Sequence, residues 1–76
     1  MNLYLGGSLA WYEPHKRSRI SLVTTGPLPL KKLLAQLSIP ETEVAVISVN
    51  GQWMDDTSCL VEDHDFISLY PPMGGG

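Results

Sequence analysis

Residues 30 to 37 are Leu30-Lys31-Lys32-Leu33-Leu34-Ala35-Gln36-Leu37. Leucine recurs here at i, i+3, i+4 and i+7, which places four leucines on one stripe of an α-helix. Pro29 suits the first turn and Pro40 disfavours helical geometry at Ile39, so we expect a helix of about 9 to 11 residues. A helix with a single apolar stripe needs one sheet to lie on, which favours a two-layer α+β domain.

Strand patterns flank this helix on both sides. Downstream, the apolar run 44–49 predicts a central strand, and Asn50-Gly51 predicts a tight hairpin turn into a short strand at 52–54. We expect Leu60 to be buried, a turn at 62–65 and a last strand at 66–70. Upstream, alternating residues 2–5 and the segment 20–23 predict two strands joined by a long loop, with pairing ending at Gly6-Gly7. The expected order is β-β-α-β-β-β, a mixed sheet of about four to five strands on one helix, and with the last strand beside the first it is a β-grasp.

The composition bounds the class of protein. The chain has 76 residues, so we expect a single thin-cored domain over residues 1–70 and a flexible extended tail over 71–76. Its net charge of −3 argues against nucleic acid as the main partner. The single cysteine fits a reducing compartment, and no apolar run approaches the roughly 18 residues of a membrane span. We therefore expect a cytoplasmic protein that contacts no membrane.

One segment of this acidic chain is basic. Three of the five basic residues lie in His15-Lys16-Arg17-Ser18-Arg19. We expect a solvated hairpin loop, with a docking patch for an acidic partner as the alternative. RNA binding is disfavoured because the sequence indicates no neighbouring stacking aromatics.

The side chains do not form a recognisable catalytic set. Cys59, His15 and His64 have neither metal-ligand nor triad spacing, so we expect no bound metal or cofactor and no enzyme. Cys59 is expected to be a small buried residue. The acidic pairs at 55–56 and at 63 and 65 fall in predicted turns, where Asp is favoured locally. Trp11 and Trp53 are expected to be partly buried.

The end of the sequence carries the strongest functional signal. Pro71-Pro72 must end the last strand, because proline donates no ladder hydrogen bond and holds an extended conformation. The sequence then reads Met73-Gly74-Gly75-Gly76. Six residues from Pro71 onward reach roughly 20 Å when extended. A run of glycines alone can also be an inert disordered end.

In these segments the sequence resembles the MoaD/ThiS family of ubiquitin-like sulfur carriers, and most closely MoaD, the small subunit of molybdopterin synthase. The resemblance covers residues 30–37, 44–51 and 60–76. It is most specific in the turn, apolar strand, Pro71-Pro72 and terminal Gly75-Gly76. Three positions differ from the family pattern. His64 stands where the family has glycine and is expected to adopt a positive φ, Pro29 replaces a Ser or Thr cap, and Gly74 replaces alanine.

The resemblance implies a chemistry at the terminus. A partner of the MoeB/ThiF type would use ATP to adenylate the Gly76 carboxylate, and a sulfur donor would convert it to a thiocarboxylate. Gly75 would pass the narrow channel of the partner, where a Cβ would clash. We expect the partner to dock on Phe66, Tyr70, Pro71, Pro72, Met73 and Gly74, although Phe66 and Tyr70 can equally be packing residues.

Several functions share this pattern. The leading one is sulfur donation to a MoaE-like subunit for molybdopterin or tungstopterin synthesis, while thiamine, cysteine and tRNA thiolation remain alternatives. A second class is a protein modifier that forms isopeptide bonds through Gly76. A third is a β-grasp interaction module with an inert tail.

Overall fold

The leucine stripe forms helix α1 (Leu30–Gln36), and its buried residues are Leu30, Leu33 and Leu34. This computed structural model describes residues 1–72. The helix is shorter than expected because Ser38 takes a left-handed φ of 59° just beyond the C-cap Leu37. The N–H of Ile39 then bonds to the carbonyl of Leu34 at 2.9 Å, which is the Schellman closure of a helix end. A single left-handed residue therefore ends the helix before Pro40 is reached.

The start of α1 has no side-chain cap. Instead, the N–H groups of Leu30 and Lys31 bond to the carbonyls of Cys59 and Thr57, both at 2.9 Å. Two of the donors that a helix start leaves without partners are therefore satisfied by a distant loop.

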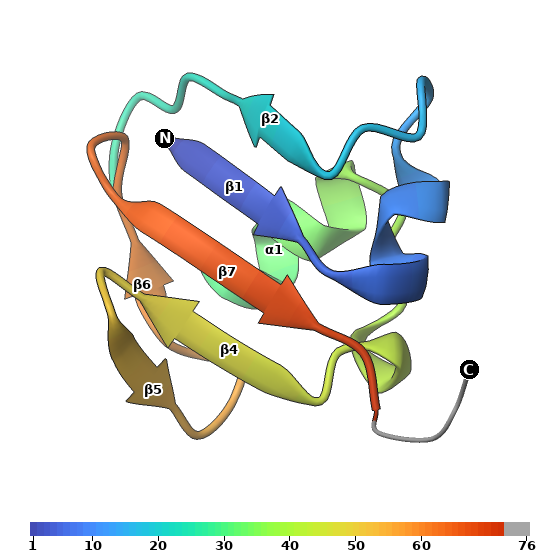
Figure 1. Ribbon diagram of the computed structural model, residues 1–76. Coiled ribbons are helices and arrows are strands. Elements are labelled where there is room, and N and C mark those ends of the chain that lie inside the picture. The colour runs from blue at the N-terminus through green and yellow to red at the C-terminus, as the bar shows by residue number, and fades with distance from the viewer. Residues whose placement is uncertain (73–76) are drawn as a thin grey trace.

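A five-stranded mixed sheet lies on one side of this helix (Figure 1). The strands are β1 (Asn2–Leu5), β2 (Arg19–Ser21), β4 (Val46–Val49), β5 (Gln52–Met54) and β7 (Phe66–Tyr70). Their order is β2-β1-β7-β4-β5, and β1 and β7 run parallel while the other neighbours are antiparallel. The last strand is thus central and lies beside the first, which confirms the expected β-grasp.

The core lies between the sheet and α1. Alternate residues of β1 and β7 are buried, and fully buried side chains of these two strands pack in one cluster with those of α1. Each such leucine or isoleucine contributes roughly 1.5–3 kcal/mol by leaving water. The buried members of the cluster on these three elements are Leu3, Leu5, Ile67, Leu69, Leu30, Leu33 and Leu34.

Two 3-10 helices and a second, two-stranded sheet were not expected. A 3-10 helix, η1 (Gly7–Tyr12), occupies the first half of the loop between β1 and β2, and a shorter one, η2 (Glu41–Glu43), precedes β4. A second sheet pairs β3 (Leu28–Pro29) with β6 (Leu60–Val61). None of the helices among residues 1–72 has the length and apolarity needed to cross a membrane.

The prediction that Leu60 is buried is wrong. Leu60 is 63% exposed and Val61 is fully buried. In β6, Val61 pairs with Leu28 and Leu60 with Pro29, and neighbouring residues of a strand face opposite ways. The register of this short pair therefore turns Val61 inward and Leu60 outward.

Two further predictions are wrong. Trp11 and Trp53 are 69% and 68% exposed, so they do not cover the core. Trp53 lies on the open face because it pairs with Ser48, which in turn pairs with Ser68 on the face of the sheet away from the core. His64 does not adopt a positive φ. Its turn closes with a bond of 3.0 Å from the N–H of Asp65 to the carbonyl of Glu62, a turn that needs no left-handed residue.

Candidate functional site

The C-terminal end of β7 directs the chain out of the middle of the sheet. The carbonyl of Tyr70 accepts a bond of 2.9 Å from the N–H of Ala45, and the carbonyl of Leu69 accepts one of 2.8 Å from Gly6. Pro71 follows half-buried and Pro72 exposed, outside any strand. The predicted end of the strand at Pro71 is therefore confirmed. Met73, Gly74, Gly75 and Gly76 lie outside the described residues, so the predictions made for them stay predictions.

Both predicted docking residues of β7 face the side of the sheet away from α1. Phe66 is 45% exposed and Tyr70 36%, and they lie at opposite ends of the strand. In Figure 1 α1 lies behind the sheet, so this open face is toward the viewer. Their outward orientation is as expected, and their role in docking stays a prediction.

The open face carries more aromatic surface than the sequence suggested. The rings of Tyr4 and Tyr70 lie 5.9 Å apart between centroids, and the Arg19 guanidinium lies 5.4 Å from the centroid of Tyr4. These three residues, with Phe66 and Ser68, line a shallow hollow of about 310 Å³. A surface of aromatic side chains around one cation has the composition of a protein-docking site.

Cys59 does not have the character of a catalytic nucleophile. It is partly buried against the core, and desolvation, reinforced by the charge of Asp56, raises the pKa of its thiol. A raised pKa leaves less thiolate, which is the reactive form. Cys59 is only partly buried, which is less than expected, while its packing against the core is confirmed.

The histidines and acidic residues do not assemble into a metal site. Among residues 1–72, no three His, Cys, Asp or Glu side chains lie where they could hold an ion together. Asp56 and Asp65 instead serve local structure: hydrogen bonds from Ser58 lower the pKa of Asp56, and one from Asn50 lowers the pKa of Asp65. The prediction that these carboxylates make local hydrogen bonds in turns agrees with this geometry, and the prediction that they form no catalytic pair stays a prediction.

An ion pair between the buried Glu13 and the exposed Arg17, which sequence reasoning missed, orders the basic loop. Glu13 is buried, and its Oε1 accepts bonds of 2.8 and 3.1 Å from the Arg17 side chain. Its Oε2 accepts bonds from the N–H groups of His15 and Arg17 at 2.8 and 2.7 Å. These bonds, chiefly that from the Arg17 side chain, lower the pKa of Glu13 to about 2. The spacing of Glu13 and Arg17 was visible in the sequence, but nothing there indicated burial.

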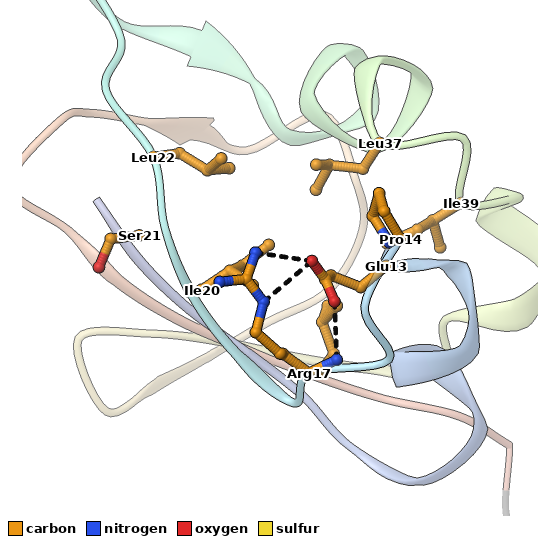
Figure 2. A pocket seen from close by; sticks show the side chains of 9 residues that line it. Glu13, Pro14, Arg17, Ile20, Ser21, Leu22, Leu37 and Ile39 are labelled. Carbon is orange, nitrogen blue, oxygen red and sulfur yellow. Dashed lines mark hydrogen bonds and ion pairs between the residues drawn. The ribbon is translucent and has the colours of Figure 1, made fainter.

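This pair borders an apolar cleft of about 230 Å³ (Figure 2). Figure 2 shows Arg17 and Glu13 facing each other, with Leu22, Leu37 and Ile39 around the hollow. Within residues 1–72, none of those that line the cleft belongs to β7 or follows it. The cleft is therefore separate from the end of β7.

The basic loop does have aromatic neighbours, contrary to the expectation. Lys16 Nζ donates a bond of 2.9 Å to the carbonyl of Trp11 and lies 5.5 Å from the centroid of its ring. Arg19 lies over Tyr4. Arg17 is paired with Glu13, so part of the positive charge is already matched within the chain. The aromatic residues beside the basic loop therefore remove one argument against nucleic-acid binding. The net charge of −3 still argues against it.

Comparisons with known proteins bear on this geometry. The sequence model of the Mut7-C ubiquitin family matches residues 9–74. No curated protein matches the chain at a significant level.

Solved structures resemble the chain over its full length. A chain in the complex of subunits 1 and 2 of molybdopterin-converting factor from Helicobacter pylori is 28% identical with a TM-score of 0.59, covering 99% of this chain and 96% of that one. The crystal structure of the thiamine biosynthesis protein ThiS from Geobacter metallireducens is 23% identical with a TM-score of 0.58, covering 100% of both chains. Its solution structure has a TM-score of 0.54 at 23% identity, covering 100% of this chain and 88% of that one. The resemblance to the MoaD/ThiS proteins, and the β-grasp fold that it implied, are confirmed.

Proposed function

Since this chain belongs to the Mut7-C ubiquitin family and has the fold of the ThiS and MoaD carriers, we propose that it is a sulfur carrier that acts through Gly76. In this proposal Gly76 is the carboxyl terminus of the working protein. The carrier is a stoichiometric donor and not an enzyme, because its own side chains supply no nucleophile or base to the reaction.

In the proposed chemistry the Gly76 carboxylate, which is a poor electrophile, is first activated and then converted to a thiocarboxylate. A partner of the MoeB/ThiF type joins the Gly76 carboxylate to AMP from ATP and releases pyrophosphate. A persulfide sulfur of a donor protein attacks the acyl carbon and displaces AMP. A thiol then cleaves the resulting acyl disulfide, and the thiocarboxylate is released. The loaded group is a sulfur nucleophile that attacks an activated carbon of the acceptor.

The observation that carries the proposal is the course of β7. This strand is held on both sides, by β1 and β4, up to Tyr70, and Pro71 and Pro72 then lead away from the sheet. The exit lies beside the exposed aromatic side chains of the open face. A rigid base next to a docking surface is what a partner needs in order to hold the domain while it works on the end of the chain.

We further propose a pterin-dithiolene synthase subunit of the MoaE kind as the sulfur acceptor. Support comes from the 28% identity to a chain of the two-subunit molybdopterin-converting factor. Thiamine synthesis is the alternative acceptor pathway, supported by the likeness in fold to ThiS. Cysteine and tRNA thiolation have no comparable support.

A ubiquitin-like modifier is the second candidate function, favoured by the ubiquitin character of the matching family. A modifier would join the same Gly76 carboxyl to a lysine amine of a target protein. Both functions begin with the same adenylate, so only the product separates them.

The test is intact mass spectrometry of the chain after incubation with ATP, the adenylating enzyme of the source organism and a persulfide donor. Exchange of one oxygen for sulfur at Gly76 is expected in the full chain and absent when Gly75 and Gly76 are deleted. Gly26→Ala is the matched control, because its Cβ meets no atom within 4 Å. Loading that survives the deletion would refute the proposal, and attachment to target lysines without any sulfur exchange would favour the modifier.

A further inference from the structure

Gly6 lies directly against the last residues of β7. Its N–H donates a bond of 2.8 Å to the carbonyl of Leu69. A Cβ at this position would lie 2.8 Å from Cδ1 of Tyr70 and 3.1 Å from the carbonyl oxygen of Leu69. The first distance is shorter than real carbon contacts allow, so any side chain at Gly6 must displace the tyrosine or the backbone of β7.

Gly7 makes a corresponding contact with Pro71, so that each partner lies one residue beyond Gly6 and Tyr70. A Cβ here would lie 3.0 Å from Cγ of Pro71, and Gly7 has a left-handed φ of 49° that favours glycine. Gly7 is also the first residue of η1, which turns the chain away from the sheet immediately after β1. Two glycines in succession thus let the backbone leaving β1 pass close beside the backbone leaving β7.

The Tyr70 ring has a second neighbour on the open face. It lies against Tyr4, which is itself covered by the Arg19 guanidinium. Tyr70 therefore lies against both the Gly6 backbone and an aromatic–cation stack. The path from Tyr70 to Pro71 therefore has little room to change direction toward Gly6 and Gly7.

We propose that Gly6 and Gly7 are positioning residues that fix the direction in which the chain leaves β7 and thereby present the reactive end to the adenylating enzyme. This inference rests on the proposed function. The two glycines touch neither substrate nor partner and act through Tyr70 and Pro71. Misplacement of a reacting group by about 1 Å can lower a rate by roughly 100-fold, so a small change of exit direction has a large effect.

The test compares Gly6→Ala and Gly7→Ala in ATP–pyrophosphate exchange with the same adenylating enzyme. We expect kcat to fall by about 10-fold or more while the Kd of the complex changes by less than about 2-fold, because neither substitution removes a side chain of the docking face. A merely structural role would instead lower the thermal midpoint and weaken binding together with kcat. Thermal unfolding of each variant is therefore measured alongside.

The chain offers a matched control for each substitution. Gly26→Ala adds a Cβ in open space and controls for Gly6→Ala. Gly51→Ala adds a Cβ at a left-handed φ of 83° with no atom within 4 Å, and controls for the backbone strain in Gly7→Ala. Both controls are expected to keep the wild-type kcat at a temperature where they are folded. Should Gly6→Ala fail to fold, Pro71→Ala carries the test, since it removes the Gly7 contact from the opposite side.

The outcomes separate this inference from the function on which it rests. If the wild-type chain is activated and Gly6→Ala and Gly7→Ala are activated at the rates of their controls, the positioning role alone is overturned. If Gly6→Ala does not fold, an unchanged kcat in Pro71→Ala overturns the positioning role. A wild-type chain that is never adenylated overturns the proposed function and this inference together.

Discussion

Asn50 and Asp65 join the β4–β5 hairpin to the start of β7 through a side-chain hydrogen bond of 2.9 Å. The Asn50 carbonyl oxygen accepts a further bond of 2.9 Å from the N–H of Phe66, and Asp65 Oδ2 accepts one of 2.7 Å from the N–H of Glu62. Asn50 also has a left-handed φ of 53° in the turn before Gly51. One residue therefore shapes the hairpin and holds the strand on which the proposed site depends.

Replacement of Asp65 by alanine is expected to lower the free energy of unfolding by about 1–3 kcal/mol, because the Asn50 amide and the Glu62 N–H lose the buried carboxylate that accepts their hydrogen bonds. Chemical denaturation measures the change. Asp55→Asn is the control, since Asp55 is exposed, and it should have little effect. Equal stability of Asp65→Ala and wild type would contradict the structural role of the Asn50–Asp65 bond.

Acid should selectively remove the contribution of the Glu13–Arg17 pair. The pKa of Glu13 is about 2 in the fold, below its ordinary value of 4.5, chiefly because the Arg17 side chain donates to it. A carboxyl whose folded pKa is depressed stabilises the protein above the unfolded pKa and loses that effect as the pH falls through the folded pKa. The difference in unfolding free energy between wild type and Glu13→Gln should therefore be constant above about pH 4.5 to 5 and shrink toward pH 2. A pH-independent difference would show that the ion pair does not act in this way.

The corrected register of β6 predicts a contrast between two leucines. Leu34→Ala removes a fully buried side chain under the sheet and should cost about 2–5 kcal/mol of unfolding free energy. Leu60→Ala removes an exposed one and should cost no more than about 0.5 kcal/mol. Urea denaturation of both variants gives the comparison. Similar losses for the two would place Leu60 in the core after all.

The open face of the sheet should carry the affinity for the adenylating partner. Phe66→Ala is expected to raise the Kd of the complex about tenfold, the effect of losing about 1.4 kcal/mol, without a matching loss of stability. Val23→Ala is the control because Val23 is also apolar, is 88% exposed and lies outside the sheet strands. Titration calorimetry with the adenylating enzyme measures both. An unchanged Kd for Phe66→Ala would assign docking to another surface.

The sequence predicted the fold wherever periodicity and turn chemistry agreed. The leucine stripe gave α1, Asn50-Gly51 gave the hairpin between β4 and β5, and Phe66–Tyr70 gave the central strand. In each case local propensity and the pattern of burial pointed to the same structure. Alternation along β7 also indicated which of its side chains face outward.

The features that the sequence did not predict depend on contacts between residues that are distant in sequence. The β3–β6 pair is too short for a readable alternation, so the register of Leu60 and Val61 follows from pairing with Leu28–Pro29. The burial of Glu13 follows from the loop closing over it, and the Gly6 contact from a strand some 60 residues away that returns beside β1. Such relationships become visible only when the topology is known.

The position of β7 also governs how a newly made molecule matures. On the ribosome β1 and β4 emerge first, yet they cannot join each other because the place between them belongs to β7. The sheet is therefore completed only when Tyr70 has left the exit tunnel, and a polypeptide broken off earlier keeps apolar strand edges that proteases and chaperones recognise. The strand that completes the sheet is thus also the base of the proposed sulfur-bearing end.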